Sequence, residues 1–231
     1  MSPRPRRLPD SAILSAAAKV VSKTGPERFT LADVGQEVGL SAATLVQRFG
    51  SKRLLMLAML EQMASIVNGR FTAKAAEGET PLESLYAAAL DRADPSHGPE
   101  QVANGIAFML MEINDPEFHA IAISSAQQAV GAYKALLDNA IEDGDLSDSS
   151  IDTLELAETI HSMTLGSLMM WVLHRDPGTK PRTRRDLDTL LRPYRRVSHK
   201  SSAKHNHDGK HNHDGKATGP KSVTPAPAIA D

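Results

Sequence analysis

The sequence contains no cysteine, a single tryptophan and only 4% aromatic residues. The lack of cysteine excludes disulfides, thiolate catalysis and cysteine-ligated zinc sites. No apolar run reaches the ~18 residues that a membrane-spanning helix needs. Residues 1–9 are basic, but Pro9 and Asp10 stand where a secretory signal would place its apolar stretch. These absences predict a cytoplasmic protein with no membrane segment.

The signatures of common enzyme sites are missing as well. The sequence has no glycine-rich phosphate loop, no nucleophile elbow and no HExxH pattern. The acidic stretch 143–154 is not an EF-hand, because Asp148 and Leu154 occupy the positions that need glycine and glutamate. We therefore predict that the protein is not an enzyme and that it has no catalytic residues, no cofactor and no metal site in its folded part.

Charge is present but unevenly distributed. Residues 1–70 hold ten Lys and Arg against five Asp and Glu, whereas residues 71–180 hold five against eighteen. Residues 181–231 are basic again, with eleven against five. A basic head on an acidic body indicates either a local contact with a polyanion or a pattern that serves solubility.

Apolar residues recur at three- and four-residue spacing along most of the chain, and no stretch alternates with period two. We therefore predict an all-α fold. Polar caps and terminating glycines mark the first helices: the caps are Asp10, Thr30, Ser41 and Ser51, and the glycines are Gly25, Gly39 and Gly50. Further helices are expected over residues 81–93, 99–114, 116–143, 151–174 and 182–196.

The segment VGLSAATLVQRFGSK, residues 38–52, has the pattern of a helix-turn-helix. Gly39 allows a sharp turn between two short helices, and Leu40 seals the corner between them. The second helix has mostly small residues on its outer face, which suits the DNA major groove, about 12 Å wide. The alternative is a helical hairpin inside a bundle, without contact to DNA.

Two groups of residues are candidate DNA contacts. Residues on the outer face of the second helix would meet base edges: Ala42, Ala43, Val46 and Gln47. Polar or basic residues at the helix starts and flanks would reach phosphates: Thr30, Ser41, Thr44, Arg48 and Lys52. Alanine and valine can touch thymine methyl groups, whereas Gln47 either pairs with adenine or is simply solvated.

This region resembles the TetR family of transcriptional regulators. The resemblance spans about residues 10–56 and rests on these residues: Ile13-Leu14, Ala17, Gly25, Thr30, Val34, Val38-Gly39-Leu40-Ser41, Thr44-Leu45, Phe49-Gly50-Ser51-Lys52 and Leu54-Leu55. It implies an all-helical homodimer with a three-helix DNA-binding domain. It also implies a larger domain that binds a small-molecule effector and dimerises through its last two helices. Val46 and Arg48 stand where the family usually has aromatic residues, and Gly35 where it usually has alanine.

The chain is accordingly divided into a basic disordered arm (1–9), a helix-turn-helix domain (10–56), a helical ligand-binding and dimerisation domain (57–197) and a disordered His- and Lys-rich tail (198–231). Candidate ligand contacts in the third segment are Phe108, Met109, Glu112, His161, Met170 and Trp171. Methionine-rich walls suit apolar or amphipathic ligands, although the same residues also serve as ordinary core.

We predict a repressor that such a ligand releases from a near-palindromic double-stranded operator. Two other functions stay open. The tail contains His205, His207, His211 and His213, which either chelate a metal ion or are only solvated. A metal-binding protein would lose its function when residues 199–231 are deleted. A helical interaction module would show no preference for any duplex and would be indifferent to Gln47→Ala and Lys52→Ala.

Overall fold

The computed structural model describes residues 8–95, 98–147, 152–175 and 178–195. Within these ranges the chain forms α-helices and a short 3-10 helix (192–194), and its extended pairing is limited to an isolated bridge between Leu146 and Arg195. This confirms the all-α prediction. The α-helices are α1 (Asp10–Thr24), α2 (Leu31–Val38), α3 (Ala42–Phe49), α4 (Lys52–Ala75), α5 (Pro81–Arg92), α6 (Pro99–Asn114), α7 (Pro116–Glu142), α8 (Thr153–His174) and α9 (Lys180–Leu191).

The predictions for most of the basic arm and for the His-rich tail lie outside the described residues. None of the helices in the described ranges is long and apolar enough to span a bilayer.

The predicted caps of α2, α3 and α4 are confirmed. The Thr30 hydroxyl accepts a hydrogen bond from the backbone N–H of Asp33 (3.2 Å), and the Asp33 carboxylate accepts one from the N–H of Thr30 (2.8 Å). The Thr30 hydroxyl also donates to the Asp33 carboxylate (2.7 Å), and this bond, together with the backbone bond of the reciprocal capping box, holds the pKa of Asp33 below its ordinary value. Ser41 and Ser51 cap α3 and α4 by accepting from the backbone N–H three residues along.

The prediction that Asp10 caps α1 is wrong. Pro9 is the N-cap, it makes no side-chain cap bond, and Asp10 is the first helical residue. The Asp10 carboxylate points to α3 instead, where it forms an ion pair with Arg48. A carboxylate in the first helical turn still favours the helix through its dipole.

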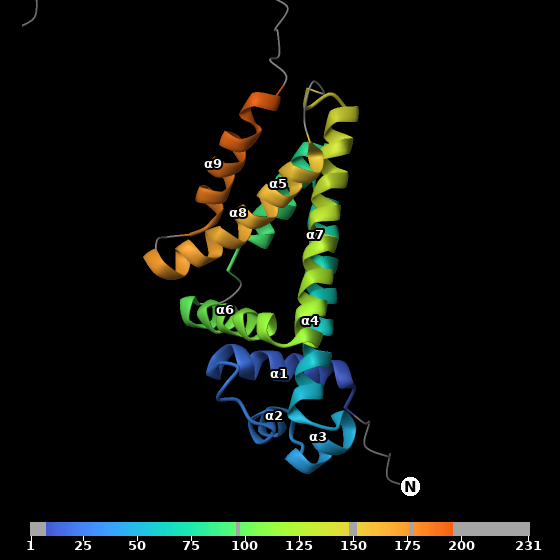
Figure 1. The fold of residues 1–231 in the computed structure, drawn as a ribbon, viewed down its shortest axis with the longest axis vertical. Helices are drawn as coiled ribbons and strands as arrows, with labels where there is room; N and C mark the ends of the chain where they lie inside the picture. Colours follow the sequence, from blue (N-terminus) through green and yellow to red (C-terminus); the bar gives the residue numbers. More distant parts are fainter. Residues whose placement is uncertain (1–7, 96–97, 148–151, 176–177, 196–231) are drawn as a thin grey trace, which may run out of the picture. The chain divides into compact units, whose positions relative to one another are not determined.

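Figure 1 shows α1, α2 and α3 grouped at one end of the folded unit, with α4 running from this group along α7 toward the other end. α6 lies across the molecule and contacts α1 on one side and α7 and α8 on the other. α5 packs on α4, α7, α8 and α9. α4 and α6 are therefore the elements through which the group α1–α3 meets the remaining helices.

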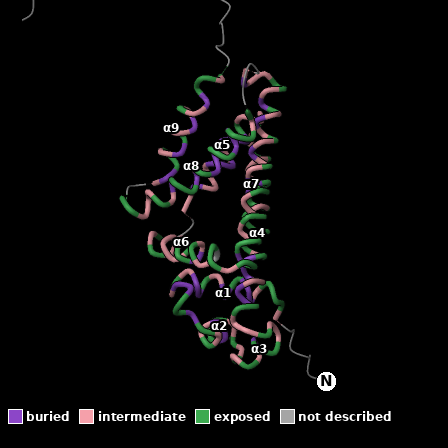
Figure 2. The backbone as a smooth tube through the Cα atoms, in the orientation of Figure 1, coloured by how far each residue is buried: buried purple, intermediate pink, exposed green. Residues whose placement is uncertain are grey.

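Two clusters of buried apolar side chains form the core. The first joins α1–α4 and includes Phe108 of α6 and Phe118 of α7, so this core extends beyond residue 56. The second lies among α4, α5, α7, α8 and α9, around the fully buried Tyr133 and Leu187. Figure 2 shows the buried positions of α1, α5 and α9 on the sides that face other helices. Each fully buried Leu or Ile contributes about 1.5–3 kcal/mol relative to exposure.

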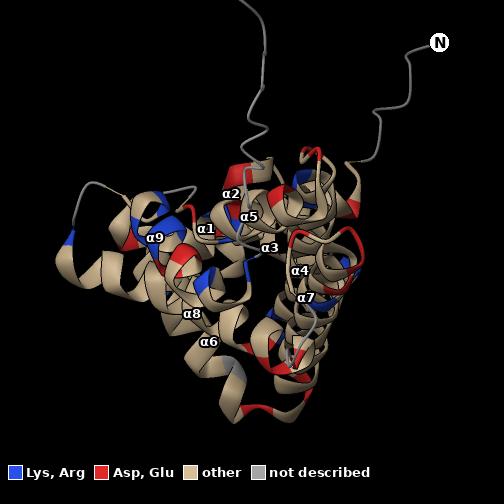
Figure 3. Ribbon diagram, turned by 90° about the horizontal axis from the view of Figure 1, so that it is seen from above, with Lys and Arg blue, Asp and Glu red and all other residues tan. Residues whose placement is uncertain are grey.

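α9 has one buried face, and its other positions are mostly charged. It buries Thr183, Leu187 and Leu191 against α5 and α8. Among the other positions Lys and Arg outnumber Asp, and Figure 3 colours these charged positions along the ribbon of α9. An apolar contact with another molecule would therefore have to come from a different helix.

Candidate nucleic-acid interface and ligand cavity

α2 and α3 form the turn that the sequence predicts. Gly39 ends α2 in the left-handed conformation (φ 69°), and its N–H donates to the carbonyl of Gly35. Leu45 of α3 is fully buried against the first core. The opposite face of α3 is open, with Ala43, Val46 and Gln47 exposed to solvent. A short helix that is anchored on one face and has mostly small side chains on the other can approach base edges closely.

Gly35 explains how closely the two helices pack. A Cβ atom placed on Gly35 would lie 2.4 Å from the carbonyl oxygen of Leu40, in the turn. The backbone N–H of Leu40 also donates to the Gly35 carbonyl (2.8 Å). The sequence alone shows a glycine at a helical position, and the close backbone contact supplies the reason for it.

The side chains that are predicted to contact phosphates differ in how far other residues of the chain already hold them. The Arg48 guanidinium donates to the backbone carbonyl of Leu8 (2.9 Å) as well as to Asp10, and its side chain is only 12% exposed. Its first role is therefore to tie α3 to the start of α1. The Lys52 ammonium lies 4.3 Å from the centre of the Phe29 ring. Thr44 is half-buried and hydrogen-bonds through its hydroxyl with Ser41 (2.9 Å).

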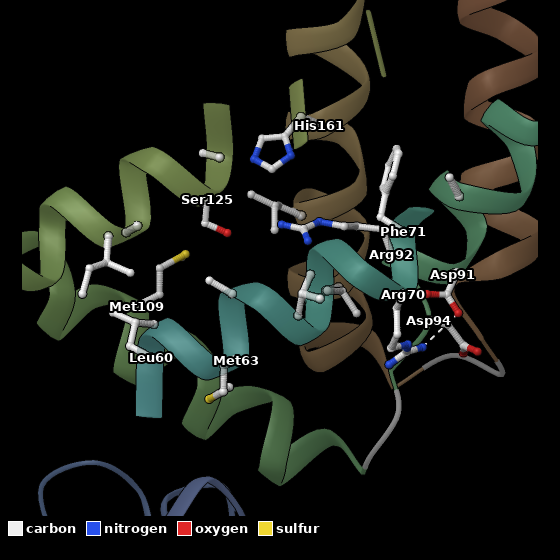
Figure 4. A pocket seen from close by; sticks show the side chains of 18 residues that line it. Leu60, Met63, Arg70, Phe71, Asp91, Arg92, Asp94, Met109, Ser125 and His161 are labelled. Carbon is white, nitrogen blue, oxygen red and sulfur yellow. Dashed lines mark hydrogen bonds and ion pairs between the residues drawn. The ribbon is translucent and has the colours of Figure 1, made fainter. Parts of the chain in front are cut away.

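A cavity of about 410 Å³ opens among α4, α5, α6, α7 and α8 (Figure 4). Most of its wall is apolar, including Leu60, Phe71, Met109 and Leu168. A second, almost wholly apolar hollow of about 310 Å³ lies between α6 and α8. The two share Met109, Leu165 and Leu168 in their walls. Together they are within the size range of small-molecule sites.

The cavity contains two of the six predicted ligand contacts, Met109 and His161. Phe108 is not among the lining residues, because its ring packs edge-on against Phe118 in the first core, with 6.3 Å between centroids. Met170 and Trp171 are half-buried on α8, outside both hollows. These three residues and Glu112 stay predictions.

Polar residues that the sequence analysis did not single out occupy one end of the cavity. Arg70 and Asp91 form an ion pair (2.9 Å), and Asp94 pairs with Lys180 (2.8 Å). Arg92 also lines this end. Its signal in the sequence is slight: it is a lone arginine that ends the apolar helix PLESLYAAALDR inside the acidic stretch of the chain.

Several side-chain contacts connect the helix-turn-helix group to the helices around the cavity. The Asn104 amide on α6 donates to the carbonyl of Ser22 near the end of α1 (2.7 Å). Arg53 at the start of α4 binds both carboxylate oxygens of Asp115, the N-cap of α7, and lies 5.5 Å from the centre of the Phe118 ring. Donation by Arg53 lowers the pKa of Asp115.

Residues 13–59 match the family model of the bacterial regulatory proteins of the tetR family. The N-terminal part of the chain is therefore similar to the DNA-binding domain of this family. The match covers α1, α2, α3 and the first turns of α4, which confirms the resemblance read from the sequence. A search of curated proteins finds no match to the chain.

Solved structures of regulators share the TetR-family fold along most of the chain. A TetR transcription regulator from Haloarcula marismortui is 17% identical (TM-score 0.68, covering 81% of this chain and 98% of that one). A proposed regulator from Saccharomonospora viridis, in complex with choline, is 16% identical (TM-score 0.70, 81% and 98%). FadR from Bacillus subtilis, in complex with stearoyl-CoA, is 13% identical (TM-score 0.61, 78% and 96%).

Choline is a cation and stearoyl-CoA an anion. The same fold therefore holds ligands of opposite charge in these two proteins.

Proposed function

We propose that the chain is a ligand-responsive transcriptional repressor that acts by binding and not by catalysis, on DNA in the cytoplasm. The observation that carries this proposal is the pairing of two features in one folded unit. One is the capped helix-turn-helix with the exposed face of α3. The other is the cavity of about 410 Å³ beside α4 and α6, the helices that contact both groups.

The proposed division of labour follows the predicted boundaries. Residues 10–56 bind DNA, and residues 57–197 bind the effector and dimerise. Ala42, Ala43, Val46 and Gln47 would face bases, while Thr30, Ser41, Thr44 and Lys52 would lie near phosphates. We assign Arg48 a positioning role, since Asp10 and Leu8 already hold its guanidinium.

We further propose a homodimer through α8. This helix exposes Leu154 (46%) and Leu173 (67%), and between them Leu165 (38%) and Met169 (45%), which also border the hollow toward α6. A two-fold dimer would present two α3 helices to one face of DNA, so the operator should be near-palindromic, with half-sites about 34–36 Å apart.

Effector binding would change the spacing of the two α3 helices. The cavity wall includes α4 and α6, and these helices reach the DNA-binding group through Arg53 and Asn104. A ligand that binds one conformer better, by a coupling free energy of about 1–3 kcal/mol, would be sufficient.

The direct test is binding of the purified chain to duplex DNA from upstream of its own coding region. A scrambled duplex of equal composition serves as the reference, and both are measured at two salt concentrations. We expect a preference for the natural duplex that persists at higher salt, because base contacts depend less on released counterions than phosphate contacts do. Equal and steeply salt-sensitive affinity for both duplexes would contradict sequence-specific recognition.

The variant Gln47→Ala tests whether Gln47 makes a contact to a base. It should weaken binding to the natural duplex by about 5- to 100-fold and leave the scrambled duplex nearly unaffected. Gln127→Ala, at an exposed position on α7, removes the same amide elsewhere and should change neither affinity. If both variants behave like the parent protein, Gln47 is only solvated and α3 reads DNA through other groups.

A further inference from the structure

The polar end of the cavity contains a cation, Arg92, that has no counterion among the residues that the structure describes. Arg92 is partly buried, and within the described residues it makes neither a hydrogen bond nor an ion pair. The acidic residues beside it are already engaged, Asp91 by Arg70 and Asp94 by Lys180. Burial lowers the pKa of Arg92, and the end of α5 offers partial compensation through the helix dipole. Desolvated charge of this kind normally has a partner.

His161 of α8 supplies a second unsatisfied group in the same wall. The residue is only 9% exposed, and its Nδ1 atom has no hydrogen-bond partner within the described part of the chain. Burial and the nearby Arg92 lower the pKa of His161, so the ring is neutral at pH 7 and can donate one N–H. Figure 4 shows Arg92 reaching into the cavity, with the His161 ring and the Ser125 hydroxyl around its guanidinium.

The rest of the space is apolar. Away from Arg92 the wall consists of residues such as Leu60, Ala64 and Ile121. The adjoining hollow between α6 and α8 adds Val102 and Ile106, and none of its lining residues that the structure describes is charged. A ligand that satisfies Arg92 at one end would therefore meet hydrocarbon along the remainder of its length.

We propose that the cavity binds an amphipathic monoanion, with a carboxylate held by Arg92 and His161 and an apolar body extending between α6 and α8. A single negative charge fits best, since Asp91 and Asp94 on the same wall would repel a dianionic head group. The guanidinium matches a carboxylate with paired hydrogen bonds. The regulatory meaning of this site rests on the proposed function, whereas its ligand class is independent of DNA.

Three probes with the same ten-carbon chain test the head group: decanoate, 1-decanol and decyltrimethylammonium. Their dissociation constants are measured by calorimetry on the full chain. Decanoate should bind at least about tenfold more tightly than the other two, as expected for a charge-assisted hydrogen bond. Equal affinities for the three probes, or tighter binding of decyltrimethylammonium, would overturn the proposal from measurements on the parent protein alone.

Variants then assign the residues. Arg92→Met should remove the preference for decanoate, Arg92→Lys should keep part of it, and His161→Phe should reduce it. Arg185→Met, which makes the same change on the exposed face of α9, should leave it intact. An undiminished preference in Arg92→Met would also overturn the assignment.

DNA binding in the presence of the probes separates this inference from the proposed function. If decanoate binds through Arg92 but never alters DNA affinity, the ligand class stands and the regulatory function fails. If 1-decanol releases the duplex and decanoate does not, the regulatory function stands and the anionic head group is wrong.

Discussion

At Gly35 the helix-turn-helix leaves no room for a side chain. Alanine is favoured over glycine in a helix by up to ~1 kcal/mol, but here its Cβ would lie 2.4 Å from a backbone oxygen of the turn. We expect Gly35→Ala to lower the free energy of unfolding by about 1–2 kcal/mol, since overpacking outweighs propensity. Gly69→Ala in α4, where a Cβ meets nothing within 4 Å, should instead stabilise the protein. Urea denaturation of both variants decides the matter, and a stabilised Gly35→Ala protein would refute the close contact.

Arg92 should cost stability in the ligand-free protein. The cation is partly desolvated and has no counterion among the described residues. Arg92→Met should therefore raise the melting temperature of the free protein by roughly 2–4 °C, as about 1 kcal/mol does in a chain of this size. Differential scanning calorimetry measures the shift. A lower melting temperature would mean that Arg92 already has a stabilising partner.

The pKa of His161 gives stability a specific pH dependence. Burial holds this pKa below the ordinary value of 6.5 in the folded state, so the unfolded chain takes up the proton first. The contribution of His161 to stability is complete above pH ~6.5 and falls as the pH decreases toward its folded pKa. His161→Gln should flatten the loss of stability between about pH 7 and 5. Parallel denaturation curves for variant and parent across this range would exclude the effect.

At the scale of elements, α6 is, with α4, one of the two helices that link the cavity to the DNA-binding group. Its Met109 lines the cavity, and its Asn104 amide binds the end of α1. Asn104→Ala should therefore speed amide hydrogen exchange at the end of α1 and in α6. Asn114→Ala is a matched control on the same helix, because its amide donates only to Leu110 of α6 itself (3.0 Å). Equal exchange in both variants would show that α6 is held on α1 by apolar packing alone.

At the scale of the whole molecule, the proposed dimer depends on α8. Leu173 is the most exposed large apolar residue of this helix, at 67%. Leu173→Glu would place two like charges across a two-fold interface and should shift the protein from dimer to monomer, with a loss of DNA affinity. Leu110→Glu changes a residue of α6 that is 56% exposed and should remain dimeric. Light scattering after size exclusion gives the masses, and dissociation of the second variant instead would move the interface to α6.

The sequence alone determined the local structure. The helix caps and the turn depend on interactions within a few residues, so the sequence pattern is enough to predict them; they lie at Thr30, Ser41, Ser51 and Gly39. The same locality made the DNA-binding family recognisable.

Tertiary structure decided which groups have partners. Asp10 reads as a cap but pairs with Arg48 from 38 positions further on, and Arg48 reads as a phosphate contact but is held in place by that pair. Arg92 reads as an ordinary helix end and becomes the charged end of the cavity only when α4, α5, α7 and α8 enclose it, because burial and charge pairing depend on contacts between distant segments.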